Sequence, residues 1–151
     1  MNWLQFRAQY GYAKEALEKK EWEKAKFHFE KALSISPSKA DALLGLAEAH
    51  VNLNEKNAAV KILETLIQDE PDFAYPYFML GKILNEKEKF DQCLALEPKN
   101  AEAWHELGKL YLHTNDQKNA IQAFSKATLL EPWICISRLE DVRNRLRASN
   151  P

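Results

Sequence analysis

Residues 104–132 read WHELGKLYLHTNDQKNAIQAFSKATLLEP, and large and small apolar residues recur in them at helical spacing. The first half ends at Thr114, Asn115 and Asp116, which favour helix ends over helix interiors. The second half ends at Pro132, which lacks the amide that would continue a helix. The stretch therefore predicts two helices joined by a turn. The recurring residues are Trp104, Leu107, Gly108, Tyr111, Ala120, Phe124 and Ala127.

Fainter copies of this pattern precede it at a period of 34 residues, which separates Pro37 from Pro71 and Pro98 from Pro132. A helix pair of this kind cannot bury its apolar face alone, so neighbouring pairs must stack. The pattern closely resembles the tetratricopeptide repeat. That resemblance implies an all-α fold, a right-handed superhelical solenoid of antiparallel helix pairs. We expect a single domain over 1–151, with repeats at 6–39, 40–73, 74–100 and 101–134.

The third unit is shorter than the others. Only 27 residues separate the prolines that end the second and third units, so seven residues are missing. Alignment from both ends places the gap between Phe90 and Asp91, within the second helix of the unit. One interpretation is a truncated hairpin that turns near 85–89, which neighbouring repeats can tolerate.

The other interpretation is an opened hairpin. No Gly or Pro stands between Gly81 and Pro98, so Tyr77 to Leu96 is compatible with one continuous helix. Each half of the chain would then lack a neighbour, and two chains could exchange halves to restore the stack. This alternative predicts a domain-swapped homodimer that serves as a self-associating assembly element.

The ends of the predicted helices carry their own signals. Asn100 is expected to cap the first helix of the fourth repeat, and Ser38 with Asp41 that of the second. After Pro132, apolar residues at three- and four-residue spacing predict a capping helix at 135–148, whose arginines alternate with acidic residues as on a solvated face. The apolar residues are Trp133, Ile136, Leu139, Val142 and Leu146, and the arginines are Arg138, Arg143, Arg145 and Arg147.

Composition narrows the class of protein. The 21 basic and 22 acidic residues leave a net charge of -1, which gives no broad electrostatic reason to bind nucleic acid or an anionic membrane. Cys93 and Cys135 are too few for a disulfide scaffold and sit among apolar residues. No apolar run has transmembrane length, and 1–10 lacks the apolar core of a signal peptide. We expect a cytoplasmic protein that does not insert into membranes.

The resemblance also implies a ligand site, a concave groove lined by the first helix of each repeat. Tyr10, Leu44, Phe78 and His105 are expected to form a row along its floor, flanked by charges of both signs, which suits an extended or helical peptide of a partner protein. Specificity is expected from Tyr10, Phe78 and His105. The nominated groove residues are Arg7, Tyr10, Lys14, Asp41, Leu44, Glu48, Asn52, Tyr75, Phe78, Lys82, Asn85, Glu102, His105, Lys109 and His113.

One known binding mode of the family is not expected. Members that bind the C-terminal carboxylate of heat-shock chaperones use lysine, asparagine and arginine spread over three repeats. The aligned positions here are Tyr10, Lys14, Gly45, Tyr75 and Met79, and only one of them is a cation. The charge-assisted contacts of a carboxylate clamp are therefore missing.

Catalytic and metal sites are also not expected. His105 and His113 share a helix face but are about 12 Å apart along its axis, too far to ligate one zinc ion. The chain has four glycines and none of the glycine-rich phosphate-binding or nucleophile motifs. We predict no catalytic, cofactor-binding or metal residue. The expected function is a protein-interaction adaptor or scaffold, with the alternative of a recruiting domain within a larger protein.

Overall fold

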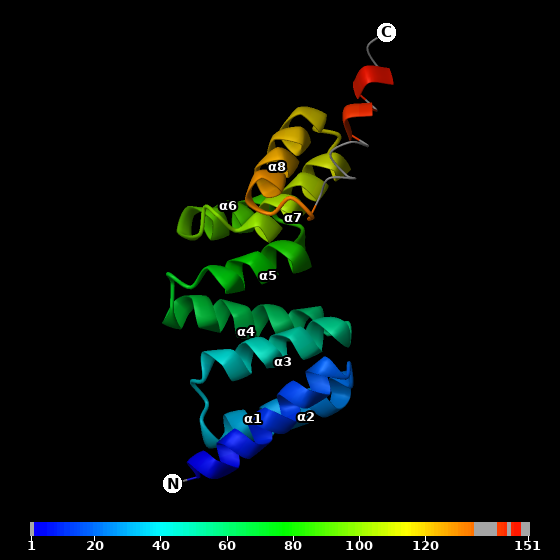
Figure 1. Cartoon of the computed structure of the whole chain (residues 1–151). Helices are drawn as coiled ribbons and strands as arrows, with labels where there is room; N and C mark the ends of the chain where they lie inside the picture. Colours follow the sequence, from blue (N-terminus) through cyan, green and yellow to red (C-terminus); the bar gives the residue numbers. More distant parts are fainter. Residues whose placement is uncertain (1, 135–141, 145, 149–151) are drawn as a thin grey trace. The chain divides into compact units, whose positions relative to one another are not determined.

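The computed structural model describes residues 2–134, 142–144 and 146–148, and every regular element in this part is a helix. The helices follow one another as antiparallel pairs joined by short turns (Figure 1), which confirms the all-α helical-repeat fold class. They fall into two compact units, Met1–Asp72 and Phe73–Pro151. The first unit holds α1 (Trp3–Glu18), α2 (Trp22–Ile35), α3 (Ala40–Asn52) and α4 (Lys56–Asp69), and the second holds α5 (Ala74–Leu84), α6 (Lys87–Leu96), α7 (Ala101–His113) and α8 (Gln117–Leu130).

Small residues let the helices of the first unit approach one another closely. The ring of Phe29 on α2 is buried and faces α3, where a Cβ added to Gly45 would lie 2.2 Å from its Cζ atom. No side chain fits in that space, so glycine is required by packing at this position. Fully buried alanines complete the contact between the helices, at Ala13, Ala25, Ala42 and Ala49.

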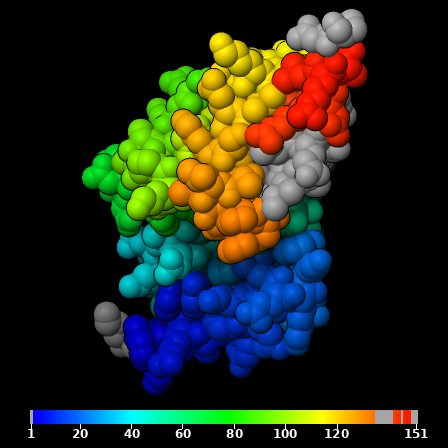
Figure 2. Space-filling view, turned by 45° about the horizontal axis from the view of Figure 1, so that its top comes forward, coloured from blue at the N-terminus to red at the C-terminus, as the bar shows by residue number. Residues whose placement is uncertain are grey.

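The second unit is packed in the same way. α7 and α8 lie side by side, and their yellow to orange atoms form one packed surface in the space-filling view (Figure 2). Phe124 is fully buried with Ala120, Ala127 and Val142. Val142 belongs to the predicted capping helix, of which 142–144 and 146–148 are helical. The remaining residues of that prediction lie outside the described part of the chain, namely 135–141 and 145.

Two predictions about the ends of helices are wrong, and one is confirmed. Asn100 caps α7, because its side-chain Oδ1 accepts a hydrogen bond of 2.9 Å from the backbone N–H of Ala103. The residue that precedes α3 is Lys39, with no side-chain capping bond, so Ser38 does not cap that helix. Trp133 lies in a turn after α8 and is 78% exposed, so it does not join the apolar stripe of a capping helix.

Each hairpin turns at a residue with a left-handed backbone. The φ angles are 58° at Lys20, 63° at Asn54, 56° at Asn85 and 60° at Asn115. Asparagine adopts this conformation more readily than most residues. Because Asn85 ends α5 in this way, the predicted continuous helix from Tyr77 to Leu96 is wrong, and the truncated hairpin is the structure of the third repeat. The domain-swapped homodimer, which the shortened third repeat motivated, stays a prediction.

Phe90 of the third hairpin makes the same contact as the aromatic residue of the fourth hairpin. A Cβ added to Gly108 on α7 would lie 2.7 Å from the ring of Phe124 on α8, and one added to Gly81 on α5 would lie 2.9 Å from the ring of Phe90 on α6. Phe90 therefore occupies the position of Phe124. The predicted gap between Phe90 and Asp91 is wrong, because it would place that ring out of step with the glycine it contacts.

The seven missing residues lie on both sides of the turn. In the fourth hairpin seven residues lead from Gly108 to Asn115 and nine from Asn115 to the phenylalanine, whereas in the third hairpin the same steps take four and five. Three residues are thus absent before Asn85 and four after it. Since an α-helix has 3.6 residues per turn, α5 and α6 have each lost about one turn next to the hairpin bend.

Candidate functional site

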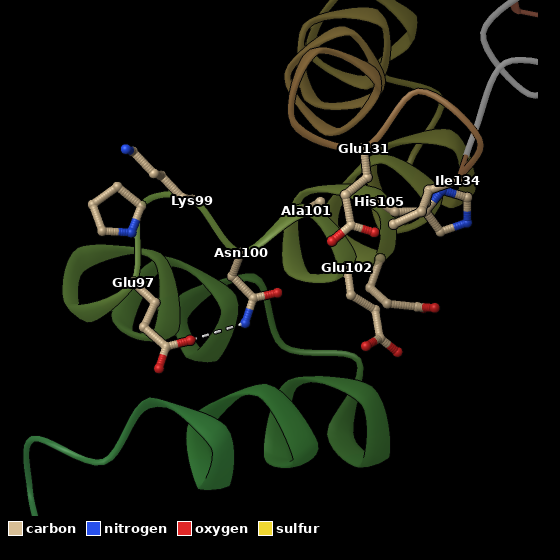
Figure 3. Close-up of a pocket in the computed structure, with 10 residues that line it drawn as sticks. Glu97, Lys99, Asn100, Ala101, Glu102, His105, Glu131 and Ile134 are labelled. Atoms are coloured by element: carbon tan, nitrogen blue, oxygen red, sulfur yellow. Dashed lines mark hydrogen bonds between the residues drawn. The ribbon is translucent and has the colours of Figure 1, made fainter.

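One face of α7 lines two hollows in the second unit. The larger one, here called the acidic hollow, has a volume of about 850 Å³ and opens between the α6–α7 loop, the first half of α7 and the segment after α8 (Figure 3). Seven of its ten lining residues are polar or charged, and Pro98, Ala101 and Ile134 are apolar. The full lining is Glu97, Pro98, Lys99, Asn100, Ala101, Glu102, His105, Glu106, Glu131 and Ile134.

Glu97, Glu102 and Glu131 outnumber Lys99, and Glu106 is paired with Lys109, so the acidic hollow carries a net negative charge. Glu102 and Glu131 both line the hollow, although they come from different elements (Figure 3). Glu97 accepts a hydrogen bond of 3.2 Å from the Asn100 side-chain amide. His105 is half-buried, and its ring packs edge-on against the Phe124 ring, with the two ring centroids 5.4 Å apart. A cationic side chain of a ligand would be attracted here.

The smaller hollow has a volume of about 270 Å³ and lies at the bend of the shortened hairpin. We call it the turn notch. Its polar wall contains the ion pair of Lys109 with Glu106, in which Nζ donates to both carboxylate oxygens at 3.0 and 2.8 Å. Lys82 lies opposite, its Nζ 5.3 Å from the centre of the Phe78 ring. The lining is Lys82, Asn85, Phe90, Glu106, Lys109, Leu110 and His113.

The two hollows are neighbours along the helix, because Glu106 lines both. From Glu102 to His113 the face extends about 16 Å along the axis, at 1.5 Å per residue. An extended peptide rises about 3.3 Å per residue, so about five residues span this length. The face is thus long enough to hold a short extended segment.

In the first unit, two of the predicted residues, Lys14 of α1 and Asp41 of α3, lie near Tyr10. The Tyr10 ring stacks on Phe6, with centroids 5.8 Å apart, and meets the buried Phe29 edge-on at 6.0 Å. Burial first, and the carboxylate of Asp41 second, raise the pKa of the Tyr10 hydroxyl. The Nζ of Lys14 lies 5.9 Å from the ring centre. Tyr10 is therefore partly a core residue and partly a surface one.

Each nominated groove residue lies on the first helix of its hairpin or directly after it. All of them are at least partly exposed except Phe78, which is 2% exposed and packs against Tyr75 and Phe90. Phe78 therefore cannot contact a ligand, and its predicted role in specificity is wrong. The common row of Tyr10, Leu44 and His105 stays a prediction. α1 carries Arg7, Tyr10 and Lys14; α3 carries Asp41, Leu44, Glu48 and Asn52; α5 carries Tyr75, Phe78 and Lys82, followed by Asn85; α7 carries Glu102, His105, Lys109 and His113.

Several lining residues were not predicted, because they lie outside the first helices or beside the nominated positions. Glu106 is on α7 next to His105, and Glu97 and Glu131 lie just beyond the C-terminal ends of α6 and α8. One signal was present in the sequence: both glutamates directly precede the prolines that end their repeats, 34 residues apart. That repeated Glu-Pro pair places a carboxylate at the same corner of two successive hairpins.

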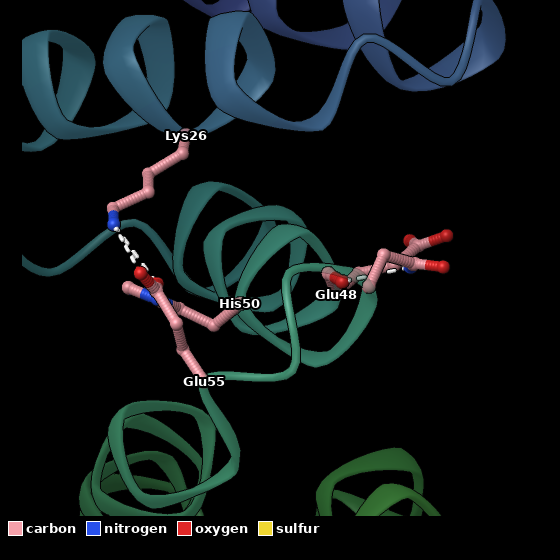
Figure 4. A network of polar contacts seen from close by, with 5 residues as sticks. Lys26, Glu48, His50 and Glu55 are labelled. Atoms are coloured by element: carbon pink, nitrogen blue, oxygen red, sulfur yellow. Dashed lines mark hydrogen bonds and ion pairs between the residues drawn. The ribbon is translucent and has the colours of Figure 1, made fainter.

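A polar network in the first unit has a structural role. Glu55 precedes α4 and accepts hydrogen bonds from Lys26 on α2, at 2.8 and 3.0 Å, and it lies 2.5 Å from His50 Nδ1 on α3 (Figure 4). These bonds, from Lys26 first and His50 second, lower the pKa of Glu55, and the bond to Glu55 raises the pKa of Lys26. The network fastens the α3–α4 turn to α2.

The described residues contain no group of three or more His, Cys, Asp or Glu side chains placed to hold a metal ion. Within the same residues, none of the helices has the length and apolar character needed to cross a bilayer. The buried Cys93 occupies the place that Ala127 has in the next hairpin, and burial raises the pKa of its thiol to about 11. A thiol of this kind is not activated as a nucleophile.

Comparison with known proteins agrees with the fold. Two family models, both described as tetratricopeptide repeat, match residues 16–80 and 89–122. Superkiller protein 3 of Schizosaccharomyces pombe is 28% identical over 118 residues, which are 69% of this chain but only 8% of that protein. The chain therefore spans a small part of the length of this curated relative.

Solved structures show the same architecture. A thermophilic TPR protein of Thermus thermophilus matches with a TM-score of 0.75 at 18% identity, over 84% of this chain and 75% of that one. YrrB, described as a TPR protein with an unusual peptide-binding site, matches with a TM-score of 0.69 at 24% identity, over 85% and 70% of the two chains. At these identities the similarities show the fold alone.

Proposed function

This chain belongs to the tetratricopeptide-repeat family, and we propose that it is a protein-interaction adaptor whose second unit holds an extended segment of a partner protein along α7. The observation that carries the proposal is the pair of neighbouring hollows on one helix face, both lined by Glu106. An interaction site needs concave surface with polar groups that fix orientation, and this face has both. The peptide-binding site ascribed to YrrB supports the same class of ligand.

The charges of the acidic hollow define one feature of the ligand. Glu102 and Glu131 have no ion-pair partner within the described residues, so they are free to receive a cation. A lysine or arginine of the peptide fits this hollow, and arginine pairs with carboxylates in the more favourable two-bond geometry. We therefore expect the bound segment to contain at least one basic residue.

Two broader parts of the function belong to the same proposal. The small share of Superkiller protein 3 that this chain matches supports a role as the recruiting domain of a larger protein. A cytoplasmic location is supported by the cysteine content, because the two cysteines of the chain are too few for the disulfide scaffold of a secreted domain. The adaptor role needs no chemistry at the site, so no catalytic residue is assigned.

The test is selection of a displayed library of random twelve-residue peptides on the full chain. The selected peptides are then tested on a second protein, the hollow variant, which carries Glu102→Lys with Glu131→Lys and so reverses the charge of the acidic hollow. The control carries Glu23→Lys with Glu64→Lys, exposed glutamates on α2 and α4. We expect the unmodified chain to enrich peptides with Lys or Arg, the hollow variant to bind them at least about tenfold more weakly, and the control to bind them normally.

The proposal fails if no peptide is enriched, or if the selected peptides bind the hollow variant as tightly as the unmodified chain. Circular dichroism spectra of all three proteins would show that the substitutions leave the helices intact. An equal loss in the hollow variant and the control would also contradict the proposal, because it would assign binding to overall charge.

A further inference from the structure

The turn notch exists because the third hairpin is short. Its walls come from the bend itself, at Lys82 and Asn85, from Phe90, and from the second half of α7. A hairpin of ordinary length would place one more turn of each helix beyond this point. The loss of seven residues therefore leaves a recess beside α7 that an unshortened repeat would fill.

We propose that the turn notch is a subsite for an acidic side chain of the peptide held along α7, an inference that rests on the proposed function. Its size suits one side chain: about 270 Å³ is below the roughly 300–1,000 Å³ of pockets that hold a whole small ligand. The apolar part of its lining, Leu110 and Phe90, would contact the methylene groups of that side chain.

The charges of the notch favour an anion. Glu106 is neutralised by two hydrogen bonds from Lys109. Lys82 is exposed and forms no ion pair within the described part of the chain, so its ammonium group is available to a ligand. Asn85 and His113 add exposed side chains with N–H groups at the rim. A carboxylate can accept a charge-assisted hydrogen bond from Lys82, the strongest contact that the notch offers.

The two hollows together define a charge pattern in the ligand. The α7 residues of the acidic hollow are centred about 9 Å along the axis from those of the notch, at 1.5 Å per residue. In an extended peptide this distance corresponds to roughly two to four residues. The bound segment should therefore carry a basic residue and, two to four positions away, an aspartate or glutamate.

The same displayed library tests this pattern on the full chain. A representative selected peptide is synthesised with its acidic residue and with the corresponding amide, and both are titrated against four proteins. These are the unmodified chain, Lys82→Glu, a filled-notch chimera and the control Lys118→Glu on the exposed face of α8. In the chimera, the sequence of residues 109–123 replaces residues 82–89, which restores the seven residues and keeps a lysine at position 82.

We expect Lys82→Glu and the chimera to bind the acidic peptide at least about tenfold more weakly, and Lys118→Glu to bind it normally. Replacing the peptide's carboxylate by an amide should weaken binding to the unmodified chain by a similar factor and have no such effect on Lys82→Glu. The comparison of the two peptides uses the unmodified chain, so it tests the acidic subsite even if the chimera does not fold.

Selected peptides that are rich in Lys and Arg without acidic residues at the expected spacing would overturn the notch and leave the proposed function standing. An amide peptide that binds the unmodified chain as tightly as the acidic one would have the same meaning. Failure to select any peptide would overturn both proposals.

Discussion

The α5–α6 and α7–α8 hairpins use the same glycine–phenylalanine contact but differ at the bend. In both, a phenylalanine of the second helix covers a glycine of the first. The longer hairpin adds a buried alanine, Ala120, near its bend, and the shorter one ends before that position. Because the missing residues amount to about one turn in each helix, the apolar faces keep their direction. The comparison shows that a repeat can lose length at its bend and keep its packing phase.

The largest expected effect tests whether the two aromatic residues are equivalent. Phe124 and Phe90 are 0% and 3% exposed, so Phe124→Ala and Phe90→Ala should each lower the free energy of unfolding by about 3–5 kcal/mol through loss of buried area and the cavity left behind. Urea denaturation followed by circular dichroism measures both. A cost below about 1 kcal/mol for Phe90→Ala would contradict the equivalence.

The glycines should give a graded and smaller effect. Gly108→Ala and Gly81→Ala each force a Cβ to within 3.0 Å of an aromatic ring, at 2.7 and 2.9 Å. Overpacking costs about 1–3 kcal/mol, and the gain in helix propensity returns about 1 kcal/mol. We expect net destabilisation by up to about 2 kcal/mol, larger for Gly108→Ala.

Gly11→Ala is the matched control for these variants, since nothing lies within 4 Å of a Cβ added at Gly11 on the exposed face of α1. Only the propensity gain remains there, so the same denaturation measurement should show stabilisation by up to about 1 kcal/mol. Destabilisation at Gly11 equal to that at Gly108 would mean that the ring contacts do not explain the glycines.

Helix caps sharpen the comparison further. Asn100 and Asp116 cap α7 and α8 through side-chain acceptors, at 2.9 and 3.2 Å from the capped amides, whereas Glu86 makes no such bond at the start of α6. Asn100→Ala and Asp116→Ala should each cost about 1 kcal/mol. Glu86→Ser should instead stabilise the short hairpin by less than about 1 kcal/mol. Thermal melting of the three variants ranks them, and a destabilising Glu86→Ser would count against the missing cap.

The smallest expected effect concerns the α3–α4 turn, which side chains fasten to α2. The pKa of Glu55 lies below its ordinary value of 4.5 because of Lys26 and His50. A carboxylate with a lowered native pKa contributes stability above its unfolded pKa and loses it as pH falls through the native value. Urea midpoints from about pH 6 to about pH 3 should fall less steeply for Glu55→Gln than for the unmodified chain. Parallel curves would show that the network makes no pH-dependent contribution.

The helix pairs were predictable because their signals are local. The alternation of large and small residues, the prolines at the ends and the asparagine before α7 each act within one helix or turn. The position of the gap was missed although the sequence carried a signal for it: Phe90 precedes Pro98 by eight residues, as Phe124 precedes Pro132. The contact of the Phe90 ring with Gly81 confirms that these two phenylalanines are equivalent.

The nominated binding residues show the same division. Their placement on first helices followed from the repeat, but the burial of Phe78 did not, because Tyr75 and Phe90 cover it from neighbouring turns and from another helix. Glu97 and Glu131 were overlooked because the repeated Glu-Pro pair shows only that they occupy equivalent positions, and not that these positions face a hollow.

Local chemistry in the sequence thus established the family, the helical-repeat fold and the presence of a short third repeat, since helix periodicity and helix ends depend on near neighbours. Only the tertiary structure decided how the shortened hairpin packs, which aromatic residues are buried and which charges meet at α7. These features arise from contacts between helices, whose free energies depend on shape and distance and not on any single stretch of residues.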